Sequence, residues 1–190
     1  MSLSQYRVLD LTDDRGQFAS FLLAELGADV VLVEPPEGSR SRLIGPFIDD
    51  EPGPDRSLFH WSYNRGKRSA VIESEQLDTL VAEADVVIGC VEDSTRLAAW
   101  RERHPALVTA AVTAFGSDGP KAEWHASDLT IAAAGGVMSV TGDQDRPPIR
   151  IGHPQSWLVA SADATTGILI ALRERTTSGL GQHVDVSAQQ

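Results

Sequence analysis

The sequence predicts an α/β fold in which helices flank a doubly wound parallel sheet. Residues 7–33 contain a strand, a helix and a strand within about thirty residues, the size of a βαβ unit. Two later apolar runs, Ala84–Cys90 and Leu107–Phe115, each follow or precede a helical segment. These runs are mostly apolar, which is typical of strands buried on both faces of a parallel sheet.

The first unit begins with the β-rich run Arg7–Leu11, and Thr12–Asp14 can cap the helix that follows. That helix is expected over Gln17–Leu26, and Gly27 ends it in a left-handed conformation. Ala28–Val33 is the second strand. The helical period places these residues on the buried side of the helix: Phe18, Phe21, Leu22 and Leu26.

A long proline-rich segment, Glu34–Arg56, has no periodicity and is expected to be a surface loop. It leads into the aromatic-rich run Leu58–Tyr63 and a polar turn over 64–68. The remaining elements alternate along the chain. We expect strands at 69–72, 84–90 and 107–115, and helices at 75–83 and 95–103.

The C-terminal part contains one long helix, expected over about 154–175, and a short strand, His183–Val186. The segment Gly152–Leu172 has no Lys, Arg or Glu, so this helix is expected to pack on more than one side. Its main buried face is predicted to consist of Leu158, Ala162, Thr165, Leu169 and Leu172. We expect about six strands and one domain over residues 1–190.

The composition narrows the class of protein. The formal net charge of −11 disfavours a nucleic-acid partner, which requires a positive surface. The single cysteine, Cys90, cannot form an internal disulfide, which fits a reducing compartment. The start of the sequence has no signal-peptide pattern, and no apolar run reaches membrane-spanning length. We therefore expect a cytoplasmic protein without a membrane partner.

Several familiar sites have no motif here. The sequence lacks GxGxxG, GxxxxGK[ST] and GxSxG, and its histidines stand singly without metal-ligand spacing, so no metal is expected. Loops after the predicted strands remain, and these are where α/β proteins bind ligands. Four basic residues lie in the loop after the second strand and in the turn over 64–68: Arg40, Arg42, Lys67 and Arg68. They are suited to bind phosphate groups, or else they are charges in contact with solvent.

The order of several blocks resembles the family III CoA-transferases, the CaiB/BaiF group that includes formyl-CoA transferase and the α-methylacyl-CoA racemases. The similar blocks are RVLDLTDDRGQFASFLLAELGADVVLVEPPEGSRSR, NRGKRSAVIE, ADVVIGC, PALVTAAVTAFGSDGP, SDLTIAAAGGVMSVTGDQDRPP and GILIALRERTTSGLGQHVDVS. The resemblance implies a Rossmann-like large domain that takes coenzyme A or acyl-CoA as substrate, and an interlocked dimer. Family members are roughly twice this length, so the chain is expected to be an N-terminal portion.

The resemblance also implies roles for particular residues. Lys67 matches a lysine that contacts the nucleotide part of CoA, and Arg96 matches a second basic contact. His125 stands where the transferase has another CoA-contacting lysine, and Arg15 replaces a glutamine near the reacting centre. The predicted CoA-binding set is Lys67, Arg96, His125, Arg15 and Arg42.

The position of the nucleophile is the notable departure. Transferases of this family use an aspartate that accepts the acyl group, and counting from Pro147 and from Gly167 places that position on Trp157. An indole cannot attack a thioester. Asp128, which matches a shared acidic position, and Asp163, six residues beyond Trp157, are the remaining candidate carboxylates.

The sequence thus predicts a protein that acts on or binds acyl-CoA thioesters, moving CoA between carboxylic acids, and that is impaired as an isolated chain. Its expected partners are acyl-CoA, a carboxylic acid, and either a second copy or a chain that carries the family's other half. One alternative is a non-catalytic acyl-CoA-binding or regulatory partner, or half of a tandem enzyme. Others are a racemase-like isomerase, although Ser127 stands where racemases have a histidine, and an unrelated nucleotide-binding domain.

Overall fold

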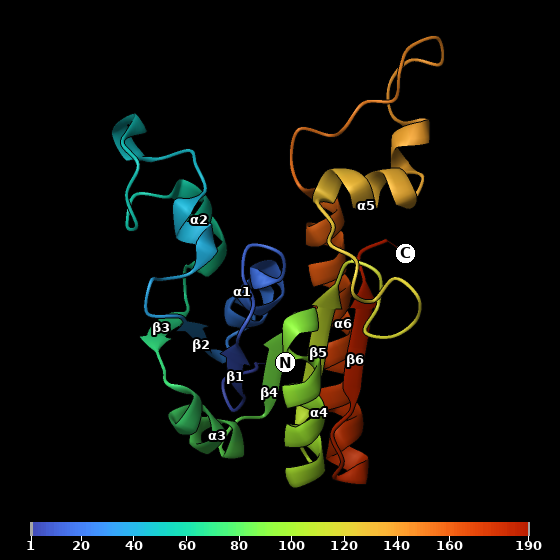
Figure 1. The fold of residues 1–190 in the computed structure, drawn as a ribbon. Helices are drawn as coiled ribbons and strands as arrows, with labels where there is room; N and C mark the ends of the chain where they lie inside the picture. The colour runs from blue at the N-terminus through green and yellow to red at the C-terminus, as the bar shows by residue number, and fades with distance from the viewer. Residues whose placement is uncertain (1, 190) are drawn as a thin grey trace.

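The computed structural model describes residues 2–189 and contains one parallel sheet of six strands with the order β3-β2-β1-β4-β5-β6 (Figure 1). The strands are β1 Arg7–Asp10, β2 Asp29–Glu34, β3 Arg68–Val71, β4 Val86–Gly89, β5 Val108–Thr113 and β6 His183–Ser187. The helices are α1 Gln17–Glu25, α2 Leu58–Asn64, α3 Ser74–Ala82, α4 Ser94–Arg103, α5 Asp128–Ala134 and α6 Gln155–Ser178. The predicted doubly wound α/β fold is confirmed.

The first strand lies at the point where the winding of the sheet changes direction. Along one of its edges β1 pairs with β2, and along the other it pairs with β4. The loops that leave β1 and β4 therefore diverge at the carboxyl ends of the strands. In open α/β sheets this divergence creates the crevice in which ligands bind.

Each face of the sheet has its own core, which explains why the inner strands are apolar throughout. Val8 and Ile88 pack on the side covered by α1 and α6, together with Ile168 of α6. Leu9 and Val87 point to the opposite side, where they pack with Trp100 of α4. Every residue of β4 and β5 is buried, as expected for central strands of a parallel sheet.

The helix predicted over about 154–175 is α6, but the predicted buried face is largely wrong. Leu158, Ala162 and Leu169 are only half-buried, and the sheet is contacted by a face that contains small side chains. That face consists of Trp157, Ala160, Ser161, Ala164, Thr165, Ile168, Ala171 and Leu172. The small residues let α6 approach closely, because a Cβ on Gly167 would lie 2.6 Å from Val184 Cγ1 of β6.

The opposite face of α6 is not packed within the described chain. Val159 and Ile170 are exposed on it, as is Asp163 between them. The expectation that this helix packs on more than one side is therefore not met by residues 2–189.

One other local prediction requires correction. On α1, Leu26 is 45% exposed, whereas Gln17 and Ser20 are buried, because the helix turns a polar face toward Asp10 at the end of β1. The aromatic-rich run after the proline-rich loop, for which the sequence predicts no structure, forms α2. Ser57 caps this helix by accepting the backbone N–H of His60 at 3.0 Å.

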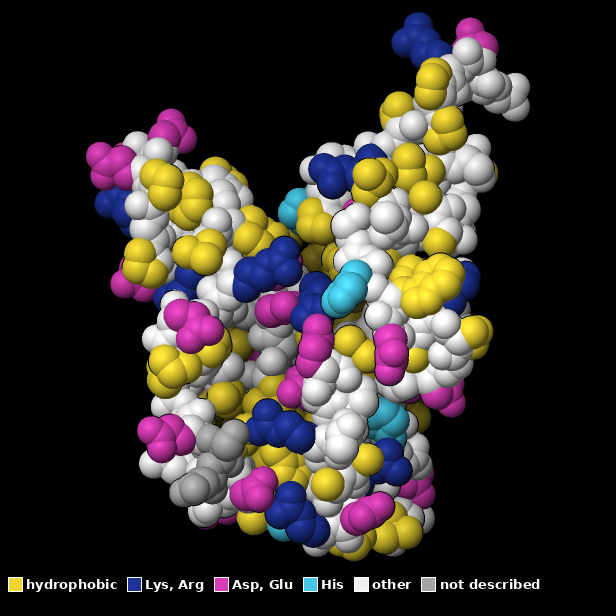
Figure 2. All heavy atoms as spheres, viewed as in Figure 1, with side chains coloured by type: hydrophobic (Ala, Val, Ile, Leu, Met, Phe, Trp, Pro, Cys, Tyr) yellow, Lys and Arg dark blue, Asp and Glu magenta, His cyan; other side chains and the backbone are white. Residues whose placement is uncertain are grey.

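Two arms extend beyond the carboxyl ends of the strands (Figure 1). One consists of residues 35–57 and α2, and the other of α5 and residues 137–151. Figure 2 shows a hollow between them, with basic, acidic and histidine side chains gathered at its base. Among the described residues, no helix has both the length and the apolar character needed to cross a membrane.

The connection into β6 depends on a glycine, and we expect Gly181→Ala to lower the free energy of unfolding by about 3 kcal/mol. A Cβ at Gly181 would lie 2.0 Å from the backbone oxygen of Leu107, so the backbone next to β5 must shift. Urea denaturation measures the effect. Gly152→Ala is the matched control, because a Cβ at Gly152 has no atom within 4 Å; equal stability of the two variants would contradict the prediction.

Candidate functional site

A buried ion pair lies directly below the carboxyl edge of the sheet. Asp10, the last residue of β1, is fully buried, and its Oδ2 lies 3.1 Å from Nζ of Lys67. The ammonium also donates to the Gln17 carbonyl oxygen and to Asn64 Oδ1, each at 2.8 Å. Burial lowers the pKa of Lys67, and the negative charge of Asp10 opposes that shift.

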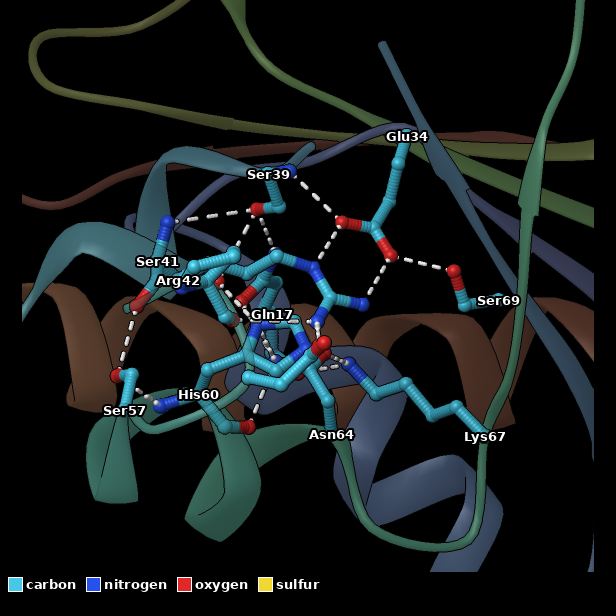
Figure 3. A network of polar contacts seen from close by, with 12 residues as sticks. Gln17, Glu34, Ser39, Ser41, Arg42, Ser57, His60, Asn64, Lys67 and Ser69 are labelled. Atoms are coloured by element: carbon cyan, nitrogen blue, oxygen red, sulfur yellow. Dashed lines mark hydrogen bonds and ion pairs between the residues drawn. The ribbon is translucent and has the colours of Figure 1, made fainter. Parts of the chain in front are cut away.

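The ion pair continues into a network of neutral polar side chains that holds the first arm (Figure 3). Gln17 donates from Nε2 to Ser39 Oγ at 2.8 Å and accepts at Oε1 from Asn64 Nδ2 at 2.9 Å. His60 Nδ1 and Ser41 Oγ are 2.7 Å apart. The network therefore joins α1, α2 and the proline-rich loop, which fixes how the arm rises above the sheet.

Arg42 is also committed to this arm. Its Nε and Nη2 form a bidentate pair with Glu34 at 2.6 and 2.7 Å, and Ser69 donates to the same carboxylate. Hydrogen bonds from Arg42 lower the pKa of Glu34 to about 2. The structure thus gives Arg42 and Lys67 internal partners, and Lys67, with a side chain only 1% exposed, cannot reach a ligand without rearrangement.

Three of the predicted site residues do meet in one cavity. A space of about 300 Å³ lies over the ends of β4 and β5, and Arg15, His125 and Trp157 line it. The loop after β1 supplies Arg15, the segment before α5 supplies His125, and α6 supplies Trp157. Arg40 and the exposed Trp124 line the same space.

The cations of this cavity differ in how firmly they are held. Arg15 pairs with Asp13 at 2.8 Å and with Glu92 at 3.1 Å. Arg40 is 70% exposed, and its nearest acidic partner is Asp14, with 3.5 Å between Nε and Oδ1. Arg40 is therefore the cation most available to an incoming anionic ligand.

A second cavity, of about 470 Å³, lies on the other side of Trp157. Apolar side chains make up much of its wall: Ile44, Pro46, Leu58 and Phe59. Tyr63 of α2 and His153, just before α6, are bonded across it with 2.8 Å between Oη and Nε2. Asp14 is its acidic residue, and burial together with the neighbouring Asp13 raises the pKa of Asp14.

Trp157 lies in the first turn of α6, and Asp128, the first residue of α5, contacts that turn. Trp157 is the third residue of the helix, and its side chain is buried between the two cavities. Asp128 Oδ1 accepts the backbone N–H of Ser156 at 2.9 Å. A carboxylate suits the positive end of a helix, so Asp128 has a structural role here as a cap of α6.

The other two predicted residues lie elsewhere. Arg96 is in α4, next to Asp93 and over the ring of Trp100, and it borders a separate space of about 170 Å³ above β1 and β2. Asp163 is exposed on the outer face of α6 and lines neither cavity next to Trp157. Neither residue is brought to Trp157 by the fold.

Two further kinds of chemistry receive no support from the geometry. Cys90 is buried at the end of β4, and burial raises the pKa of its thiol, so the reactive thiolate is disfavoured. Within residues 2–189, no three His, Cys, Asp or Glu side chains are grouped so that they could hold a metal ion.

The fold places three residues at the cavities that are absent from the predicted CoA-binding set: Arg40, Asp14 and Trp124. Arg40 is a basic residue in a loop after a strand, and the sequence alone does not distinguish a phosphate contact from a solvated loop charge. Asp14 was interpreted as part of a helix cap. In the structure α1 begins without a side-chain cap, which leaves Asp14 at the cavity wall.

Comparison with known proteins identifies the family. The profile of CoA-transferase family III matches residues 3–190. The chain belongs to CoA-transferase family III. The family expected from the sequence blocks is thereby confirmed.

Relatives and solved structures agree with this assignment. The chain is 34% identical to succinyl-CoA:(R)-benzylsuccinate CoA-transferase subunit BbsE of Thauera aromatica, over 97% of this chain and 48% of that protein. It is 35% identical to succinyl-CoA:mesaconate CoA-transferase of Haloarcula hispanica, over 98% and 51%. A CaiB/BaiF family protein from Brucella suis superposes with a TM-score of 0.89 at 32% identity, covering 98% of this chain and 53% of that one. The chain spans about half the length of these relatives.

Because Lys67 neutralises a fully buried carboxylate, Lys67→Ala is expected to lower the free energy of unfolding by about 3–5 kcal/mol. Chemical denaturation is the measurement. Arg68→Ala is the matched control: Arg68 pairs with Asp29 at the surface, where an ion pair contributes at most about 1 kcal/mol.

The double variant Asp10→Asn/Lys67→Met removes both charges and is expected to recover part of that loss. A Lys67→Ala protein as stable as Arg68→Ala would show that the ion pair does not have this structural role.

Proposed function

We propose that this protein binds acyl-CoA thioesters along the carboxyl edge of its sheet and takes part in CoA transfer between carboxylic acids. We propose further that it is impaired in transfer as an isolated chain. The observation that carries both statements is the cavity in which Arg15, Arg40 and His125 surround Trp157. The relatives named above are CoA-transferases, which supports the reaction class, and the indole at position 157 supports the impairment.

The binding proposal rests on where the cations lie. Coenzyme A carries phosphates, for which guanidinium groups are suited donors. Arg40 stands at the open side of the cavity with no hydrogen bond to its nearest acid, and His125 is exposed beside it. On the far side of the β4 loop, Arg96 offers a second cation above β1 and β2. A CoA molecule between these points would cross the switch point of the sheet.

The impairment rests on chemistry at position 157. In CoA transfer an aspartate attacks the thioester carbonyl, CoA leaves as a thiolate, and an anhydride links the enzyme to the acyl group. The first turn of α6 would support such a carboxylate, since backbone N–H groups there favour an anion. The indole of Trp157 occupies this place, and Asp128 is engaged with Ser156.

The same observation favours a second candidate function, a non-catalytic acyl-CoA-binding partner or one half of a larger enzyme. Such a protein needs the cavity but not the nucleophile. A racemase-like function has less support, because Ser127 accepts the Thr130 N–H as a helix cap and offers no imidazole. For either candidate we propose a homodimer or a partner chain, consistent with a relative that is named as a subunit.

Calorimetry with free CoA tests the binding proposal. We expect heat of binding at millimolar ligand or below, and Arg40→Gln is expected to weaken the affinity about tenfold through loss of a charge-assisted contact. Arg146→Gln is the control, since Arg146 pairs with Asp143 at the surface and lines neither cavity. Absence of heat with the unmodified chain would overturn the CoA proposal.

Incubation with an acyl-CoA, followed by hydroxylamine trapping and mass spectrometry of the intact protein, tests the impairment. The unmodified chain is expected to form no acyl adduct, whereas Trp157→Asp gains one on the new carboxylate. Trp157→Asn, which places a similar side chain without the nucleophile, is the control. An adduct on any carboxylate of the unmodified chain would contradict the proposal.

A further inference from the structure

The acidic residue in the wall of the second cavity has no role in the function proposed so far. Asp14 follows β1 and belongs to the loop that precedes α1. Its Oδ1 is the one buried side-chain oxygen or nitrogen without a hydrogen-bond partner among the described residues. Such atoms are rare in folded proteins, and a buried one calls for an explanation.

The surroundings of Asp14 leave its charge poorly compensated. The nearest cation, Arg40, is separated by 3.5 Å without a hydrogen bond and is mostly in water. Arg15, which lies in the same loop as Asp14, is held by Asp13 and Glu92. The rest of the cavity wall is mostly apolar, and its polar side chains already have partners: Tyr63 and His153 are bonded to each other, and Ser62 donates to the Leu58 carbonyl oxygen. Little polar surface is therefore left to stabilise a second negative charge there.

The position of the cavity relative to Trp157 indicates what would enter it. If the thioester lies at position 157, as the proposed function requires, the CoA part occupies the cavity with the cations. The acyl group then continues past Trp157, which lines both spaces. The second cavity is therefore the place for the acyl chain, and its apolar side chains suit a hydrocarbon.

We propose that Asp14 selects the acyl group: the second cavity accepts neutral, apolar acyl chains and rejects acyl groups that end in a carboxylate. This inference rests on the proposed acyl-CoA binding and adds the substrate class. Rejection follows from like charge, because a terminal carboxylate would lie in an apolar space beside an ionised and incompletely paired aspartate.

The test compares two thioesters that share CoA and differ at the end of the acyl chain. Calorimetry at pH 8 measures the affinities of hexanoyl-CoA and succinyl-CoA for the full chain, and their ratio cancels the contribution of CoA. Hexanoyl-CoA is expected to bind about tenfold more tightly or better. In Asp14→Asn, which keeps the size of the side chain, the ratio is expected to fall to near one through a gain in affinity for succinyl-CoA.

Two variants control for other causes. Asp143→Asn changes the net charge equally but lines neither cavity, so it is expected to leave the ratio unchanged. Arg40→Gln removes the partial counter-charge of Asp14 and is expected to raise the ratio, whatever it does to CoA affinity itself.

Each result has one meaning. Succinyl-CoA binding as tightly as hexanoyl-CoA, or a ratio that Asp14→Asn does not change, overturns the role of Asp14 while CoA binding stands. Absence of binding by free CoA and by both thioesters overturns the proposed function on which the inference rests.

Discussion

The buried pair between Asp10 and Lys67 is the interaction on which the architecture of the site depends. A carboxylate at the end of the central strand has no access to water, so a cation and several hydrogen bonds must neutralise it. Lys67 lies just before β3, two strands away, and Ser20 and Gln17 come from α1. Satisfying one charge thus aligns β1, α1 and the start of β3, and it accounts for the buried polar residues Gln17 and Ser20 of α1.

The two arms are attached in different ways. The first arm is held by hydrogen bonds among Gln17, Asn64 and His60. Lys67 connects this network to Asp10, so the position of the arm depends on the buried ion pair. The second is anchored at its base, where Asp128 caps α6 and ties α5 to the longest helix. Tyr63 of the first arm is bonded to His153, which lies between the second arm and α6. The cavities beside Trp157 therefore have walls from parts of the chain that are far apart in sequence.

Periodicity and composition were sufficient to predict the sheet and most of its helices, since the inner strands are apolar on both faces and the first helix has a glycine stop. They failed where small or polar residues are buried. Ala160 and Ala164 face the sheet because α6 packs closely against it. The distance between a helix and a sheet cannot be read from the hydrophobic periodicity of the sequence. The ligand contact expected for Lys67 came from the family resemblance, and the sequence does not show that Asp10 is its partner within the chain. Asp14 became a candidate, and Arg40 was set apart from the other loop cations, only when tertiary contacts placed them at the two cavities.

The indole at position 157 also has a thermodynamic consequence. An aspartate there would be largely removed from water between two cavities, and a buried carboxylate lowers stability unless ligands or hydrogen bonds compensate for it. Trp157 instead contributes apolar burial, about 1.5–3 kcal/mol for a large side chain, and it joins the core that α6 forms with the sheet. On the proposed assignment of position 157 as the place of the nucleophile, this substitution is an exchange between stability and activity of the kind that is common at reactive centres. Retention of the protein in evolution would then depend on binding rather than on turnover.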